Sequence, residues 1–171
     1  SGLSPRENRE IPPLQYNRVY ALKDRYPEFT IVINGGITRI DQAAAHLERV
    51  DGVMVGREAY QNPWSLIEVD HVLFGDTPTY PSRLDVLEAY KTYMRDELEK
   101  GVPLKRLARH LLGLFQGEPG ARTWRRALSE AAFRSGADLT AIEAAQNSLD
   151  TTRREHAAVS AASNQGMGLR L

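Results

Sequence analysis

The chain has 171 residues, of which 22 are basic and 22 are acidic, and it contains four histidines and no cysteine. This length suits one domain or one domain and part of another, and the neutral charge balance excludes a global positive field that would gather nucleic acid. The lack of cysteine excludes a disulfide framework, a thiolate zinc site and a cysteine nucleophile within these residues. Because no run approaches the ~18 apolar residues of a membrane span and no signal peptide is evident, we expect a cytoplasmic protein without a membrane partner.

The first part of the chain alternates predicted helices with short apolar runs. Thr38 and Asp41 have the spacing of a capping box, which predicts a helix start between the two runs. The alternation of helices and strands with short loops indicates parallel strands joined by right-handed crossovers. In chain order we predict a loop at 1–13, a helix at 14–25, a strand at 29–33, a helix from 38 toward 50, and a strand at 53–55.

From Pro78 onward the pattern becomes helical, and Pro78 with Pro81 marks the expected boundary between two parts. Ser82 and Asp85 again have capping-box spacing, and Asp138 is placed to cap a later helix. We predict helices from 82 to 100, 103 to 116, 121 to 135 and 138 to 149. The sequence therefore predicts an α/β part at 1–77, a small all-α bundle at 78–149 and a disordered tail at 150–171.

Positive charge is concentrated in the predicted bundle. Residues 103–134 hold only two acidic side chains, Glu118 and Glu130, whereas the basic residues there are Lys105, Arg106, Arg109, Arg122, Arg125, Arg126 and Arg134. A basic block confined to one part of a neutral chain is typical of a face that docks phosphates, and a merely solvated helix surface is the alternative.

Both predicted strands end in glycine. Asn34, Gly35 and Gly36 follow the first strand, and Gly56 and Arg57 follow the second. The carboxyl ends of parallel strands lie at one edge of a sheet, so the backbone N–H groups of these residues and the Arg57 guanidinium would suit an anionic phosphate. The alternative is that these glycines only form tight turns.

The sequence offers no convincing catalytic or metal-binding group. We expect His46 on a charged helix surface and His110 on the basic face, and no pair of histidines has the spacing of metal ligands. We expect Phe115 and Trp124 at core positions, since their spacing matches the apolar stripe of the predicted helices.

Five segments make the comparison with a known family specific. They are GLSPRENREIPPL at 2–14, INGGI at 33–37, DGVMVGREAY at 51–60, HLLGLFQG at 110–117 and PGARTWRR at 119–126. Together they closely resemble the tRNA-dihydrouridine synthases of the A subfamily, and the resemblance extends over residues 2–149. It implies a TIM barrel that binds FMN, followed by a helical domain that helps to hold tRNA. It also implies reduction of the 5,6 double bond of D-loop uridines, at tRNA positions 20 and 20a, with NADPH recharging the flavin.

The resemblance assigns roles to nine residues, and each role is an expectation here. Arg6 occupies a position where relatives often carry Lys, so it keeps the charge but not the geometry of the contact. The expected cofactor-binding residues are Asn34, Gly35 and Gly36 after barrel strand 7 and Gly56 and Arg57 after strand 8. The expected tRNA-binding residues are Arg6, Arg9, Arg122 and Arg125.

The chain also departs from the family pattern. A cysteine of an earlier barrel loop protonates uridine C5 in the family, and this chain has none. It holds two predicted strands where a TIM barrel has eight, so we expect the last two βα units of a barrel, completed by an N-terminal barrel half. We predict that the chain alone neither retains FMN tightly nor reduces uridine.

Two other interpretations remain open at this point. One is a non-catalytic tRNA-binding module formed by residues 79–149. The other is a different phosphate-binding barrel, such as a flavin dehydrogenase of a small molecule, although the helical part argues against it.

Overall fold

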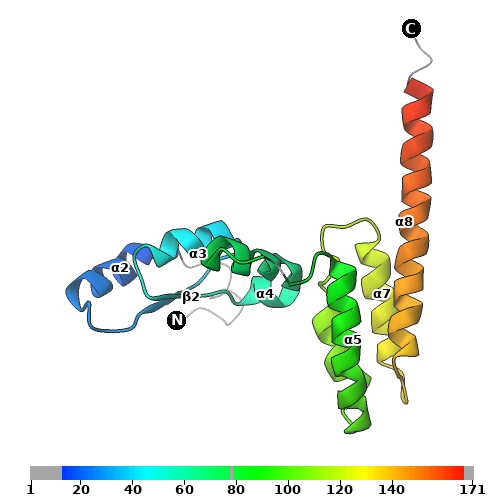
Figure 1. Cartoon of the computed structure of the whole chain (residues 1–171), viewed down its shortest axis with the longest axis horizontal. Helices are drawn as coiled ribbons and strands as arrows, with labels where there is room; N and C mark the ends of the chain where they lie inside the picture. Colours follow the sequence, from blue (N-terminus) through cyan, green and yellow to red (C-terminus); the bar gives the residue numbers. More distant parts are fainter. Residues whose placement is uncertain (1–12, 78, 168–171) are drawn as a thin grey trace, which may run out of the picture.

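The computed structural model describes residues 13–77 and 79–167, with side chains described as far as residue 161. Two units with separate apolar cores follow each other along the chain (Figure 1). We call residues 13–77 the α/β unit and residues 79–167 the helical unit. The α/β unit contains α2 (Tyr16–Arg25), β1 (Val32–Asn34), α3 (Ile40–Leu47), β2 (Gly52–Met54), α4 (Arg57–Gln61), a 3₁₀-helix at Pro63–Ile67 and a π-helical turn at Asp70–Phe74.

The two strands pair in parallel, as the alternation of helices and strands predicted. Val32 aligns with Gly52, and Asn34 aligns with Met54. Ile33 is buried in a small core with Ala43 of α3 and with side chains of α2, so these helices cover one face of the pair. On the other face, Val32 and Met54 are each 53% exposed.

The first strand begins later than the sequence pattern predicted. Phe29 is exposed and stacks on Tyr26 with ring centroids 5.6 Å apart, so it takes no part in the sheet. The Asp51 carboxylate accepts hydrogen bonds from the Ile31 N–H at 2.8 Å and from Lys23 Nζ at 2.9 Å. At Ile31 the Asp51 side chain thus binds the N–H, while the Asp51 N–H donates to the Ile31 carbonyl at 3.0 Å, and the strand ladder begins at residue 32.

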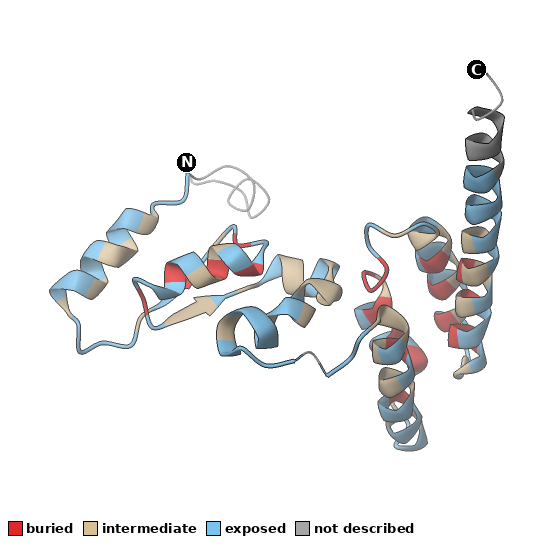
Figure 2. Ribbon diagram, turned by 45° about the horizontal axis from the view of Figure 1, so that its top comes forward, coloured by how far each residue is buried: buried red, intermediate tan, exposed pale blue. Residues whose placement is uncertain are grey.

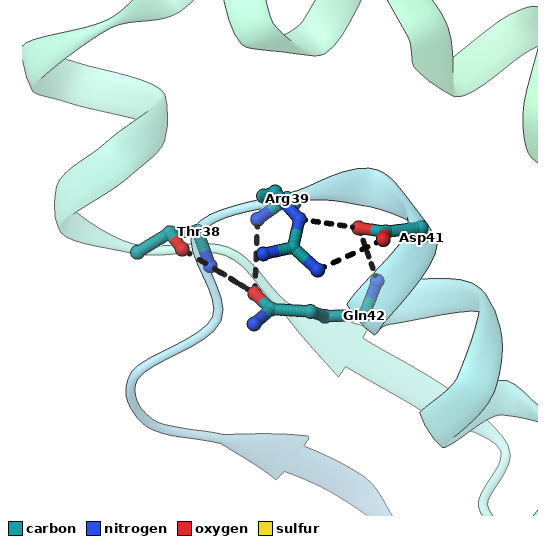
Figure 3. A network of polar contacts seen from close by, with 4 residues as sticks. All are labelled: Thr38, Arg39, Asp41 and Gln42. Atoms are coloured by element: carbon teal, nitrogen blue, oxygen red, sulfur yellow. Dashed lines mark hydrogen bonds and ion pairs between the residues drawn. The ribbon is translucent and has the colours of Figure 1, made fainter.

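The predicted capping pair of α3 is wrong by one residue. Gln42 Oε1, rather than Asp41, accepts the backbone N–H groups of Thr38 and Arg39, at 3.1 and 3.2 Å. Asp41 instead forms a two-pronged ion pair with Arg39, with both N–O distances at 2.9 Å (Figure 3). That guanidinium holds the pKa of the Asp41 carboxyl below its usual value. The longer glutamine side chain reaches back to the helix start, and this leaves Asp41 free to bind Arg39.

The helical unit has the larger core. Ser82 Oγ accepts the Asp85 N–H at 3.2 Å, which confirms the predicted cap. Phe115 and Trp124 are fully buried, as expected, and their rings meet edge to face at 4.9 Å. The elements of this unit are α5 (Arg83–Glu99), α6 (Leu104–Ala108), a 3₁₀-helix at Arg109–Leu111, α7 (Ala121–Ala132) and α8 (Thr140–Met167).

The single helix predicted from 103 to 116 is wrong, because the chain passes from α6 through the 3₁₀-helix into a series of turns. Carbonyl groups of these turns receive side-chain donors from elsewhere in the unit. Trp124 Nε1 donates to the Leu111 carbonyl at 2.8 Å, and Arg83 donates to the carbonyls of Leu114 and Gln116 at 2.7 and 3.0 Å. These bonds give hydrogen-bond partners to carbonyl groups of turns that form no helical ladder.

The expectation that the last helix ends near Leu149 is also wrong, and of the tail expected to be disordered from residue 150, the part after Met167 lies outside the described residues. The Asp138 carboxylate accepts the Thr140 N–H at 2.9 Å, as predicted, but α8 then continues to Met167. Its first half buries Ile142, Ala145 and Leu149 and lies beside α7, whereas residues 154–161 are exposed (Figures 1 and 2). This second half contains Ala157, Ala158 and Ala161, and alanine has the highest helix propensity of all residues.

Candidate functional site

A cleft lies at the carboxyl ends of the two strands, and we call it the strand-end cleft. Its volume is about 520 Å³. All five residues that the sequence singled out at the strand ends contribute to its wall: Asn34, Gly35, Gly36, Gly56 and Arg57. The parallel register explains this convergence, because Asn34 and Met54 are paired neighbours and both loops therefore begin at the same edge.

Gly35 and Gly36 are required by the fold itself. Both have positive φ, at 120° and 64°, and a Cβ at either position would approach the Leu14 side chain to 2.8 or 2.6 Å. Tyr16 donates from its hydroxyl to the Gly35 carbonyl at 2.6 Å. Since the C=O and N–H of one trans peptide point in opposite directions, this bond turns the Gly36 N–H away from Tyr16. The tight-turn alternative therefore accounts for these two glycines, and it is compatible with an exposed N–H.

Gly56 differs from the other two glycines. A Cβ built at this position would meet nothing within 4 Å, so the backbone here is open. Arg57 follows immediately as the first residue of α4 and is exposed, which places a guanidinium at the same wall of the cleft. A small anion can thus approach the main chain at Gly56 and meet a positive side chain.

One acidic side chain, Glu58, also lines the cleft, and it already accepts a hydrogen bond from within the chain. Glu58 Oε1 accepts a hydrogen bond from Asn62 Nδ2 at 2.9 Å. The other amide atom, Asn62 Oδ1, is buried without a hydrogen-bond partner among the described residues. Glu58 and Gln61 were not selected from the sequence. Helical spacing within α4 could have identified Gln61, because it lies four residues after Arg57.

The predicted basic surface is also present. Arg122, Arg125 and Arg126 are exposed along α7, while Trp124 and Leu128 of the same helix are fully buried. We call these three arginines the α7 basic face. Further exposed basic residues lie on and just after α6, opposite its buried leucines: Lys105, Arg106 and Arg109. Arg6 and Arg9 lie outside the described residues.

Of the two histidines whose positions were predicted, the structure confirms one and contradicts the other. His46 is buried, not on a charged surface, because Nδ1 lies 2.5 Å from the Tyr20 hydroxyl and the Tyr16 ring packs edge-on against it. His110 is exposed beside Arg109, as expected, and contacts the Tyr60 ring.

Within the described part of the chain, no three acidic or histidine side chains group as metal ligands. Among the described helices, none combines the length and apolarity needed to cross a bilayer.

In α/β proteins, ligands bind at the carboxyl ends of parallel strands, and this chain has a glycine-lined cleft at that edge, joined to a helical unit with a basic surface. Residues 2–151 match the dihydrouridine synthase family, and the chain belongs to this family.

Curated relatives support the assignment. The chain is 55% identical over 150 residues to a tRNA-dihydrouridine(20/20a) synthase of Shewanella oneidensis, which covers 88% of this chain and 45% of the relative. It is 55% identical over 143 residues to the synthase of that name from Escherichia coli K12, covering 84% and 41%. The chain is 50% identical over 145 residues to the Vibrio cholerae protein of that name, which covers 85% of this chain and 44% of that protein. The chain thus spans less than half the length of these relatives.

Proposed function

We propose that this chain forms the C-terminal portion of an FMN-dependent tRNA-dihydrouridine synthase that reduces D-loop uridines at positions 20 and 20a with NADPH. The observation that carries the proposal is the convergence, on one strand-end cleft, of the five residues that the resemblance assigns to cofactor binding, all of which lie within the family match. The exposed sheet face, with Val32 and Met54, is the surface that the remaining barrel strands would cover. The matched relatives are named as synthases, so a non-catalytic RNA-binding module is not favoured.

The residues of the cleft suit a phosphate of the cofactor. The backbone at Gly56 leaves room for an anion, and the Arg57 guanidinium supplies positive charge. The negative Glu58 carboxylate in the same cleft is hydrogen-bonded to Asn62. When bound, FMN would supply the hydride that reduces the uridine double bond, and NADPH would supply electrons to the flavin. In this proposal the residues of the chain itself bind the cofactor and the tRNA and orient them. The proton for uridine C5 comes from a cysteine in the family, and this sequence contains none.

The α7 basic face, with Arg122 and Arg125, would bind phosphates of the tRNA. Contacts of this kind orient the RNA without reading its sequence. A target uridine inside a folded tRNA must leave its base stack to reach a barrel pocket, so a firm hold on the surrounding backbone is needed. Arg6 and Arg9 are proposed to add contacts from the barrel side.

A chimaera tests the proposal. The N-terminal part of the Shewanella oneidensis relative would be joined to this chain, and the purified product would be examined for a flavin spectrum and for dihydrouridine formation in tRNA. We expect the chimaera to be yellow and active, and this chain alone to be colourless and inactive. A chimaera that folds but is colourless would refute the proposal. A stoichiometric flavin spectrum from this chain alone would refute the expectation that FMN binding requires the other barrel strands.

Within the chimaera, Gly56→Ala separates cofactor binding from folding. The added methyl group has no neighbour within 4 Å in this chain but projects from the backbone that the phosphate would approach. We expect weaker FMN binding with little change in melting temperature. Ala45→Ser, an equally small change on the exposed side of α3, serves as the matched control.

A further inference from the structure

The two units meet through their backbones at Gly113. This glycine lies in the turns after α6 and is buried. A Cβ at this position would lie 1.8 Å from the Gln61 carbonyl oxygen, 2.5 Å from its carbonyl carbon and 3.1 Å from Pro63 Cδ. The closest atoms belong to the main chain at the end of α4, so no side-chain rotation can make room for them.

Two contacts with aromatic rings also join one unit to the other. The Tyr60 ring meets His110 edge to face, with centroids 5.7 Å apart. The Arg83 guanidinium lies over the Trp64 ring at 5.2 Å. Together with Gly113 they form three points of contact, which is the number that defines the orientation of one rigid body on another.

The Arg83 contact is itself anchored to the segment that carries Gly113. Arg83 donates to the carbonyl groups of Leu114 and Gln116, and it lies 3.6 Å from Glu118. Its burial, which outweighs the nearby Glu118 charge, lowers the pKa of this guanidinium from its ordinary value. The guanidinium thus holds the turns in place while its face packs on Trp64.

This junction lies next to the strand-end cleft. Gln61 lines the cleft and is the residue whose carbonyl Gly113 contacts, and α4 extends only from Arg57 to Gln61. On the other side, the same turns lead directly into α7 and its basic face. The approach of Gly113 to Gln61 therefore sets where the RNA-binding arginines lie relative to the cofactor cleft.

We propose that Gly113 is a positioning residue that holds the helical unit at one orientation to the cleft, so that RNA bound by the α7 basic face is presented to the cofactor. The functional meaning rests on the proposed function, whereas the orientation itself is testable without it. Any side chain at residue 113 must push the units apart, because a normal carbon contact requires at least 3.4 Å where 1.8 Å is available.

The absence of cysteine makes a direct test possible in this chain. Spin labels would be placed on cysteines introduced at the exposed positions Glu48 of the α/β unit and Glu155 of α8, and the distance between them measured by pulsed electron resonance. We expect a narrow distribution for the parent and a shifted or broadened one for Gly113→Ala. Gly117→Ala is the matched control: it adds the same methyl group four residues later, where nothing lies within 4 Å. It is expected to lower the melting temperature, because φ is +82° there, but to preserve the distance.

An unchanged distribution in Gly113→Ala would overturn the proposal, and so would equal broadening in Gly117→Ala, which would indicate general loosening. If Gly113→Ala does not fold, His110→Ala removes the ring contact without adding atoms; it should broaden the distribution at unchanged helix content, and an unchanged distribution there would count against a defined junction. Binding of tRNA to the parent chain is measured separately. Its failure would contradict the tRNA proposal but would leave the distance result intact.

Discussion

The α7 basic face allows a quantitative prediction for tRNA binding. Arg122 and Arg125 are exposed and point away from the buried Trp124, so replacing both by alanine removes two positive charges without opening the core. Each lost phosphate contact makes the plot of log affinity against log salt less steep by about 0.7 to 0.9. For two contacts the slope should fall by about 1.4 to 1.8, which corresponds to roughly 25- to 60-fold weaker binding at 0.1 M salt.

The assay is a titration of fluorescently labelled tRNA with the parent chain and the double variant at several salt concentrations. A second double variant, Arg18→Ala with Arg95→Ala, makes the same change in net charge at exposed positions on α2 and α5. It should lower the affinity much less. If both double variants lose the same affinity and slope, tRNA senses only the net charge of the chain, and the proposed docking role of α7 is refuted.

Three further predictions concern the fold. The hydrogen bond from the Ile31 N–H, and to a lesser degree the one from Lys23, lowers the pKa of the Asp51 carboxyl below its unfolded value of about 3.9. The ionised carboxylate therefore stabilises the fold above that pH, and this stabilisation is lost as the pH falls through the folded pKa. Asp51→Asn should therefore lower the melting temperature at pH 7, and the difference from the parent should shrink below about pH 4; a constant difference would contradict this. Trp124→Phe removes the donor to the Leu111 carbonyl and should cost at least about 1 kcal/mol in urea unfolding, so an unchanged midpoint would show that the bond contributes nothing. Deleting residues 155–171 should leave the melting temperature almost unchanged, since residues 155–161 are exposed, and a large drop would reveal packing there.

Local chemistry was sufficient to predict the elements that depend on neighbours in sequence. The caps at Ser82 and Asp138 follow from residue type and spacing, and both form the expected hydrogen bonds. Apolar spacing also separated the buried Trp124 from the exposed arginines of α7. The convergence of the two glycine-ended strands followed from their order along the chain, because parallel strands bring their carboxyl ends to one edge.

The predictions failed where a distant residue decides the outcome. His46 looks like a surface residue by its charged neighbours, yet the hydroxyl of Tyr20 reaches it from another helix. The helix expected to reach residue 116 ends early, and donors from the distant residues Trp124 and Arg83 bind carbonyls of the turns that replace it.

The sequence by itself determined the alternation of helices and strands, the glycines at the strand ends and the basic surface, since these follow from backbone preference and periodicity within short segments. Only the tertiary structure decided that Gly35 and Gly36 must accommodate Leu14, that Gly56 is open and that Gly113 lies against the backbone of Gln61. What a missing Cβ makes possible depends on the atoms that approach it, and those atoms come from parts of the chain that only folding brings together.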